Sequence, residues 1–326
     1  MTNRTRRTST RFVFALAIFL LLLYPAKRVI VHLAWKGIAD PPVERLWSGD
    51  VPGALGTTDA DQPSVAVFLP ARWHSTKAGM VVVPGGGYKM VMSSYEGEDV
   101  ARWLNSFGVA AFVLTYRIGP RYHHPAPLVD ATRAVRYVRY HAARFGVLPE
   151  RVGIIGFSAG GHLASTVMTH FDSGDPQAAD PVDRISSRPD FAVLGYPLIS
   201  LESPWAHAGS VSNLLGPNPD PAQIRELSND LQVTEKTPPA FLFHTTDDIQ
   251  VPAQNSILFY SALHSHGVDS ELHIFEHGGH GAGLANGHGA APRVPDLVNW
   301  SALAEDWIVG RFKNARTWSY SMLFRL

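Results

Sequence analysis

Short, wholly apolar runs alternate along this chain with segments whose apolar positions recur at helical spacing. Apolar runs without alternation are typical of strands buried on both faces of a sheet. The expected strands are residues 64–69, 78–83, 109–116, 152–155, 191–194, 240–243 and 272–275, and the expected helices lie near residues 98–107, 128–145, 159–168, 252–266 and 300–308. This order predicts an α/β fold, a mostly parallel central sheet with helices on both faces.

Two stretches lie outside this pattern. Residues 37–63 are rich in Gly, Pro, Asp and Thr, which favours a linker and an irregular lead-in to one domain over residues 64–314. Residues 198–238 carry prolines at 204, 217, 219 and 221 and predict an excursion over the edge of the sheet, with one short helix after Asp220. Residues 315–326 are expected to be a C-terminal tail.

The N-terminus carries an export pattern. Arg4, Arg6, Arg7 and Arg11 precede an uninterrupted apolar run over residues 12–24, which Lys27 and Arg28 close. The run is shorter than the roughly 20 residues that span a bilayer, and it lacks small residues at a cleavage site. Residues 1–36 therefore predict a signal peptide or, slightly favoured, a signal anchor with a cytoplasmic arginine-rich tip. The rest would be periplasmic or extracellular.

Composition narrows the chemistry. The 326 residues have a formal net charge of zero and 17% charged residues, so no nucleic-acid partner is expected and uncharged ester or amide substrates remain open. The absence of cysteine excludes disulfides, thiolate metal sites and a cysteine nucleophile. Composition does not indicate the oligomeric state.

A Gly-x-Ser-x-Gly motif around Ser158 stands between an apolar run and a helical segment. A serine on a tight strand-to-helix turn needs small neighbours two residues before and after it, so that its hydroxyl is exposed at the strand end. The alternative is a glycine-rich turn with an incidental serine, which would have no catalytic partners downstream.

Two later loops supply such partners. A serine nucleophile needs a general base, and the base needs an acid to fix its tautomer. Asp247 and Asp248 follow the run 240–243, and His277 and His280 follow the run 272–275. Loops at the carboxyl ends of parallel strands meet at one edge of the sheet.

Four segments in this order resemble the α/β-hydrolases of the acetyl xylan esterase and carbohydrate-esterase-like group (BD-FAE-like). They are Pro-Gly-Gly-Gly-Tyr at 84–88, Gly-Phe-Ser-Ala-Gly-Gly-His at 156–162, Asp-Asp-x-x-Val-Pro at 247–252 and Gly-Gly-His-Gly at 278–281. The similarity extends from about Leu46 to Trp307. It implies the α/β-hydrolase fold, a serine hydrolase acting on carboxylic esters, an acetylated saccharide as substrate and no cofactor.

The resemblance also favours one member of each pair. Its usual spacing before Val-Pro selects Asp248 as the acid, although Asp247 could act while Asp248 caps the following helix. Glycines at 278, 279 and 281 let the backbone bring His280 close to Ser158, which favours His280 over His277.

The oxyanion donors follow from the same pattern. One is expected to be the backbone N–H of Ala159, next after the nucleophile. The other is Gly86 or Gly87, in the loop where many esterases carry His-Gly-Gly-Gly. This chain has Pro84 in place of that histidine, so its loop must be held differently.

The predicted function is a serine carboxylesterase that removes small acyl groups, acetyl in particular. A serine peptidase or amidase of the same fold is the alternative, and a membrane-tethered binding protein without activity is a second. His277, His280 and His288 lack the spacing of a zinc signature, so no metal is expected. Arg117 and Asp130 are expected to form a structural ion pair.

Overall fold

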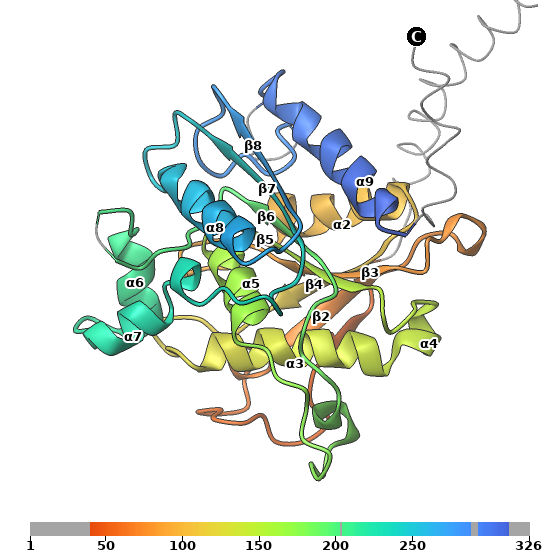
Figure 1. Cartoon of the computed structure of the whole chain (residues 1–326). Helices are drawn as coiled ribbons and strands as arrows, with labels where there is room; N and C mark the ends of the chain where they lie inside the picture. Colours follow the sequence, from red (N-terminus) through yellow and green to blue (C-terminus); the bar gives the residue numbers. More distant parts are fainter. Residues whose placement is uncertain (1–39, 203, 288–292, 313–326) are drawn as a thin grey trace, which may run out of the picture. The chain divides into compact units, whose positions relative to one another are not determined.

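The computed structural model describes residues 40–202, 204–287 and 293–312 (Figure 1). From Pro42 onward they form one unit around a sheet of eight strands, in the order β1-β2-β4-β3-β5-β6-β7-β8. The strands are β1 (Val43–Arg45), β2 (Ser64–Phe68), β3 (Gly79–Val83), β4 (Ala110–Thr115), β5 (Val152–Phe157), β6 (Ala192–Gly195), β7 (Ala240–Thr245) and β8 (Ser270–Phe275). Strands β3 to β8 pair in parallel, whereas β2 pairs antiparallel with both of its neighbours, β1 and β4. This confirms the mostly parallel sheet predicted from the sequence.

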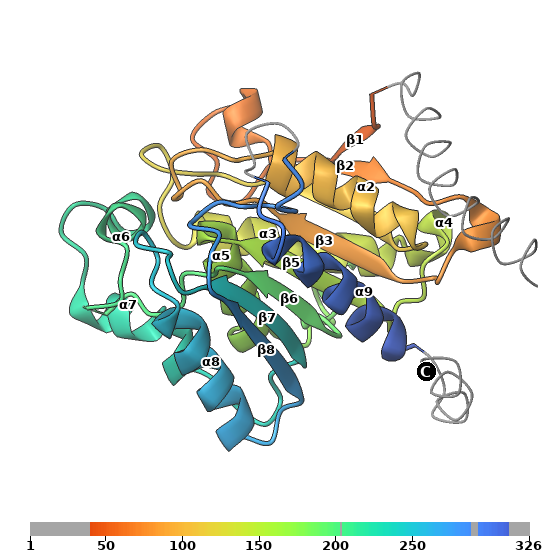
Figure 2. The same cartoon turned by 90° about the horizontal axis from the view of Figure 1, so that it is seen from above.

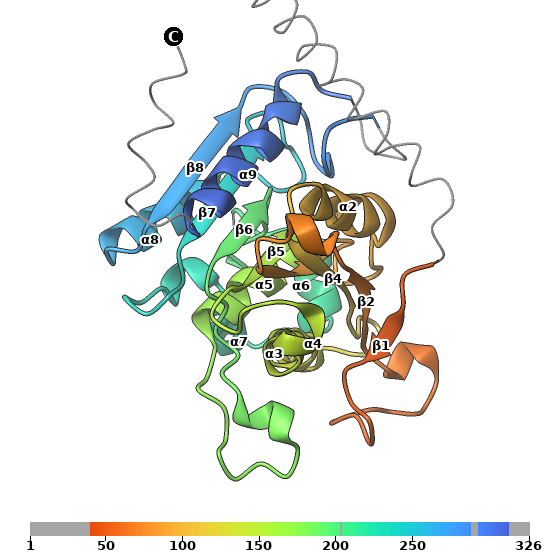
Figure 3. The same cartoon turned by 90° about the vertical axis from the view of Figure 1, so that its right-hand side faces the viewer.

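Helices cover both faces of the sheet (Figures 2 and 3). Two of them, α2 (Asp99–Ser106) and α9 (Trp300–Gly310), pack their apolar residues into one core layer. Three others, α3 (Ala126–Tyr140), α5 (Ala159–Thr169) and α8 (Gln254–Ser265), pack into the layer on the opposite face. The central strands β3 to β7 are buried on both faces over nearly their whole length, which explains their apolar runs.

Three elements are small or lie away from the expected pattern. The segment predicted as an irregular lead-in contains β1, a three-residue edge strand that pairs with β2. The proline-rich segment 198–238 contains the expected helix α7 (Pro221–Glu226) and an additional one, α6 (Ala208–Leu215), beside it (Figure 1). The short helix α4 (Ala142–Phe145) closes the long segment that begins with α3.

The buried ion pair between Arg117 and Asp130 is present as predicted. The guanidinium Nη2 donates to Asp130 Oδ1 at 2.7 Å, and the backbone N–H of Arg117 donates to Oδ2 at 2.8 Å. Both side chains are at most 1% exposed. The pair joins the segment after β4 to helix α3. Its contacts are internal to the fold, in keeping with a structural role.

The first and last described elements meet the sheet at the end where its parallel strands begin. The carbonyl of Pro42, just before β1, accepts from Val67 N–H at 2.9 Å, near the start of β4. The ring of Phe312, after α9, lies 5.4 Å from that of Phe191, just before β6. The guanidinium of Arg151, just before β5, lies 5.0 Å from the same Phe312 ring. Residues 42 and 312 therefore lie at the edge opposite the carboxyl ends of the strands.

The predicted signal or anchor, residues 1–36, falls outside the described residues, as does the tail from residue 313 on. Within the described ranges, no helix is both long enough and apolar enough to cross a membrane.

Candidate active site

Ser158 occupies a sharp turn between the end of β5 and the start of α5. Its backbone φ is 54°, a left-handed conformation that a non-glycine residue adopts only when its surroundings impose it. The turn is closely packed, since a Cβ on Gly160 would lie 2.2 Å from the carbonyl oxygen of Val83 and one on Gly156 would lie 2.2 Å from that of Gly160. These contacts explain why the sequence has glycine two residues before and after the serine.

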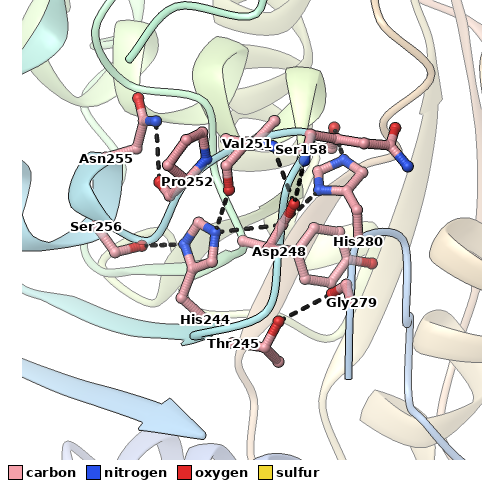
Figure 4. Close-up of polar contacts among 12 residues, drawn as sticks. Ser158, His244, Thr245, Asp248, Val251, Pro252, Asn255, Ser256, Gly279 and His280 are labelled. Atoms are coloured by element: carbon pink, nitrogen blue, oxygen red, sulfur yellow. Dashed lines mark hydrogen bonds and ion pairs between the residues drawn. The ribbon is translucent and has the colours of Figure 1, made fainter. Parts of the chain in front are cut away.

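The structure brings Ser158, His280 and Asp248 into one hydrogen-bonded chain (Figure 4). Ser158 Oγ lies 2.7 Å from His280 Nε2, and His280 Nδ1 lies 2.7 Å from Asp248 Oδ2. A carboxylate only accepts, so Nδ1 carries the imidazole proton and Nε2 is left to accept from the serine hydroxyl. This is the arrangement in which a serine can be deprotonated as it attacks.

Asp248 is held as a carboxylate by several donors. Its Oδ1 accepts from the backbone N–H groups of Gln250 and Val251 at 3.0 and 2.9 Å. Buried His244 places Nε2 3.3 Å from Oδ2 (Figure 4). Burial alone would raise the pKa of Asp248, but the hydrogen bonds from His244 and His280 outweigh it and hold this pKa well below its usual range. Asp248 therefore stays charged beside the imidazole.

The two competing residues have other contacts. Asp247 accepts from the backbone N–H groups of Gly279 and Gly278 at 2.8 and 3.2 Å, and the bond from Gly279 is the main reason that its pKa is lowered. His277 is 68% exposed and pairs with Asp247 at 3.5 Å, and Ser158 is not among its partners. Asp247 thus holds the loop that carries His280, and Asp248 contacts the imidazole itself. Asp248 does not cap α8, because it accepts from the N–H groups of Gln250 and Val251, whereas α8 begins only at Gln254.

The glycine loop after β3 lies against Ser158. A Cβ on Gly85 would lie 3.0 Å from Ser158 Cβ. Gly85 donates its N–H to Glu96, whereas the N–H groups of Gly86, Gly87 and Ala159 donate to no group in the described part of the chain. Ala159 is the first residue of α5, where backbone N–H groups are unsatisfied and favour negative charge. None of the three groups has a described partner that would compete with an oxyanion, and Gly86 and Gly87 both stay candidates.

A tyrosine and a histidine secure the far end of this loop. Tyr88 donates its hydroxyl to His162 Nδ1 at 2.7 Å, and His162 Nε2 donates to the carbonyl of Leu227 at 2.8 Å. Burial lowers the pKa of His162 to about 4, so its imidazole is neutral at ordinary pH and one nitrogen is free to accept. The loop is thus fastened to α5, the helix behind the nucleophile. Tyr116 adds a bond to the carbonyl of Pro84 at 2.8 Å.

Glu96 is a buried acid beside the site that no sequence motif indicated. It belongs to a π-helical turn, Ser94–Glu98, that runs into α2. Its Oε2 accepts from Gly85 N–H at 2.8 Å, and its Oε1 accepts from the Tyr196 hydroxyl at 2.7 Å. Burial raises the pKa of Glu96, against these two hydrogen bonds. Single-turn π-helices are frequent at functional sites.

The proline-rich excursion borders the site through α6. Asn213 donates its side-chain amide to the carbonyl of Gly87 at 2.8 Å. His207, the residue before α6, accepts from the backbone N–H of Ser210 and lies close enough to His280 and Asp248 to interact with them electrostatically. Burial is the main cause of the lowered pKa of His207. The excursion therefore contributes one wall beside the glycine loop.

No group of three or more His, Cys, Asp and Glu side chains in the described ranges could hold a metal ion. The chemistry available here is that of the side chains and of the backbone N–H groups.

Comparison with known proteins fits this geometry. The family model named BD-FAE matches residues 65–263, more than half of the chain. The chain belongs to the BD-FAE family. This confirms the resemblance predicted from the four sequence segments.

Two curated relatives of this family member carry xylan-related names. An endo-1,4-beta-xylanase B of Butyrivibrio fibrisolvens is 39% identical over 213 residues, which are 64% of this chain and 33% of the relative. An acetylxylan esterase of Xylanibacter ruminicola is 35% identical over 251 residues, 76% of this chain and 49% of the relative. The matches thus span a third to a half of these relatives' length.

A solved structure matches nearly end to end. The acetyl ester-xyloside bifunctional hydrolase from Caldicellulosiruptor lactoaceticus is 45% identical, with a TM-score of 0.77, over 85% of this chain and 98% of that one. MGS-M1, an α/β hydrolase from a deep-sea metagenome library, is 26% identical with a TM-score of 0.59, over 84% of this chain and all of that one. These matches confirm the α/β-hydrolase fold.

Proposed function

We propose that this BD-FAE family member is a serine carboxylesterase that removes acetyl groups from xylan or related oligosaccharides through an acyl-enzyme. The observation that carries the proposal is the continuous chain Ser158–His280–Asp248, with both links at 2.7 Å, beside unpaired backbone N–H groups. A nucleophile, an oriented base and an oxyanion site are the three parts that acyl transfer needs.

The steps follow from the proton positions. Ser158 Oγ attacks the ester carbonyl carbon while its proton passes to His280 Nε2, and Asp248 stabilises the imidazolium. The oxygen of the tetrahedral intermediate accepts from Ala159 N–H and from Gly86 or Gly87 N–H. The bond to the alcohol oxygen then breaks, and His280 returns the proton to it. Water then attacks the acyl-enzyme in the same way, giving its proton to His280 Nε2. His280 returns this proton to Ser158 Oγ as the acid leaves.

The relatives support the class and the substrate. The names acetylxylan esterase and acetyl ester-xyloside hydrolase both denote carboxylic ester hydrolases that act on acetyl groups. The site geometry supports acyl transfer, and the relatives' names favour an ester over an amide. Transfer of the xylan-linked substrate to this chain rests on these relatives.

A substrate panel with a serine variant tests the proposal. The full chain is assayed on acetylated xylan, other acetyl sugars, p-nitrophenyl acetate, feruloyl esters and dipeptide amides. We expect acetate release from the acetyl esters, and we expect Ser158→Ala to lose about 10³-fold or more of kcat. Undiminished hydrolysis by Ser158→Ala would refute the serine mechanism. Cleavage of the amides alone would favour a peptidase, and inactivity on the whole panel a binding protein.

We also propose that the chain is exported. The support is the sequence of residues 1–36, with its arginine-rich start and apolar run. Export would bring the esterase to polysaccharides that do not enter a cell.

A further inference from the structure

The carboxylate of Glu96 connects segments that come from three different parts of the chain. One oxygen accepts from the N–H of Gly85, in the glycine loop after β3, at 2.8 Å. The other accepts from the hydroxyl of Tyr196, just after β6, at 2.7 Å. Glu96 itself is 2% exposed, so water does not compete for either bond.

Tyr196 continues this connection to the loop of the general base. Its hydroxyl oxygen accepts from the backbone N–H of Gly283 at 2.8 Å, three residues after His280. Its ring packs edge-on against the His280 imidazole, with ring centres 5.2 Å apart at 68°. Tyr196 is fully buried and has a backbone φ of 34°, so its position is imposed by its surroundings.

From this geometry we infer that Glu96 is a positioning residue that fixes the oxyanion loop and the His280 loop relative to each other. The inference rests on the serine esterase function proposed above. Glu96 does not touch the substrate. It accepts the hydrogen bond from the N–H of Gly85, so this group cannot turn toward the oxyanion. The N–H groups of Gly86 and Gly87 are then left to face the oxyanion. Through Tyr196 it holds the segment that follows His280.

Pro84 stands where many esterases carry a histidine, and this bears on the role of Glu96. The loop has no histidine before its three glycines that could anchor it. Hydrogen bonds to other parts of the fold anchor it instead, among them those from Gly85 to Glu96, from Tyr88 to His162, from Asn213 to the carbonyl of Gly87 and from Tyr116 to the carbonyl of Pro84. Among these bonds, the one to Glu96 also leads, through Tyr196, to the His280 loop.

Two substitutions at Glu96 test this role. Glu96→Ala removes both acceptors, and we expect kcat on p-nitrophenyl acetate to fall about 100-fold, comparable to the loss of one oxyanion donor, while KM stays within about threefold. Glu96→Gln keeps an oxygen for the Gly85 N–H, and we expect it to recover kcat to within about tenfold of the wild type. Inhibition by a small alkyl boronic acid, whose adduct with Ser158 places an oxygen at the oxyanion site, should weaken in step with kcat/KM.

Tyr196→Phe tests the second half of the connection without opening a cavity at Glu96. It removes the link to Gly283 and leaves Gly85 bound, so we expect kcat to fall about tenfold with KM unchanged. If Glu96→Ala does not fold, this variant and Glu96→Gln decide the question. Asp190→Ala is the matched control, because Asp190 accepts from Val152 N–H at the start of β5, a strand length from Ser158. It should lower the Tm and leave kcat within about twofold.

The outcomes separate the inference from the function on which it rests. An inactive wild type, or an active Ser158→Ala variant, overturns both. An active wild type whose folded Glu96→Ala variant keeps kcat within about threefold overturns the inference alone. The same holds if Tyr196→Phe keeps full kcat, if Glu96→Gln is no better than Glu96→Ala, or if boronate inhibition does not weaken.

Discussion

His280 makes one hydrogen bond with each ring nitrogen, and the two partners differ in kind. Asp248 only accepts, so it fixes the proton on Nδ1, and Ser158 can then donate to Nε2. Asp247 lies one residue away and accepts from the backbone N–H groups of Gly278 and Gly279, in the loop that carries His280. Neighbouring aspartates thus have different tasks, and substitution should distinguish them.

Asparagine at each position gives a direct comparison. In Asp248→Asn the amide can present an N–H to His280, which favours the wrong tautomer, and we expect kcat to fall about 10³- to 10⁴-fold. Asp247→Asn keeps one acceptor for the Gly279 N–H, so we expect less than a tenfold change in kcat, roughly the effect of one weakened hydrogen bond. Steady-state kinetics on p-nitrophenyl acetate measure both. A larger loss in Asp247→Asn would reverse the two roles.

The sequence indicated the residues that occur in motifs and did not indicate those that support them. Ser158, Asp248 and His280 follow strands at recognisable spacings, and the structure brings these three together. Glu96 and Tyr196 are 100 residues apart in the chain and belong to no motif, so only the folded chain shows their contact. His244 was visible just before the aspartates, but its support of Asp248 depends on how the end of β7 is buried.

At the scale of elements, the turn from β5 into α5 joins the nucleophile to the glycine loop. His162 stands in the first turns of α5 and receives the Tyr88 hydroxyl, so the loop and the helix share a buried hydrogen bond. This bond requires a neutral imidazole, because a protonated ring has no acceptor nitrogen. The stability of the element pair should therefore depend on pH.

The direction of that dependence follows from the lowered pKa. Folding lowers the pKa of His162 from 6.5 to about 4, so between about pH 4 and 6.5 the unfolded chain binds a proton that the folded chain does not. The contribution of neutral His162 to the free energy of unfolding is complete above about pH 6.5. It is lost as the pH falls toward 4, by at most about 1.4 kcal/mol per pH unit.

Denaturant unfolding of the wild type and of His162→Gln between pH 4 and 7 measures this effect. The variant should be less stable at pH 7, and its free energy of unfolding should fall less steeply with decreasing pH. The difference between the two slopes should correspond to at most one bound proton. Equal slopes in the two proteins would show that His162 does not titrate in this way. The comparison uses slopes, so a general loss of stability in the variant does not affect it.

The long, periodic elements could be predicted and the short ones could not. All seven runs expected as strands form strands. In β3 to β7, burial on both faces over nearly the whole strand leaves an unbroken apolar run. Strand β1 has three residues with an exposed first and last position, too few to show a period. Helix α6 has only eight residues and begins after His207, which is not among the usual N-cap types. Neither its length nor its cap therefore allowed a prediction from the sequence.

At the scale of the whole molecule, the N-terminal segment determines where the esterase would act. An exporting host should either remove residues 1 to about 26 or retain them as an anchor, and the sequence slightly favours the anchor. N-terminal sequencing of the mature protein, with membrane fractionation, distinguishes these outcomes. A mature chain that begins after about residue 26 would contradict the anchor, and protein confined to the cytoplasm would contradict export.

Residues 42 and 312 lie where the parallel strands begin, and Ser158 follows the end of β5. The six residues of β5 separate these two edges by about 20 Å. A support coupled near either residue, such as a bead or a carbohydrate-binding module, would leave the reactive serine directed away from it. An immobilised form could therefore work on an insoluble polymer. Such a polymer meets the enzyme as a surface, so Ser158 must face away from the support.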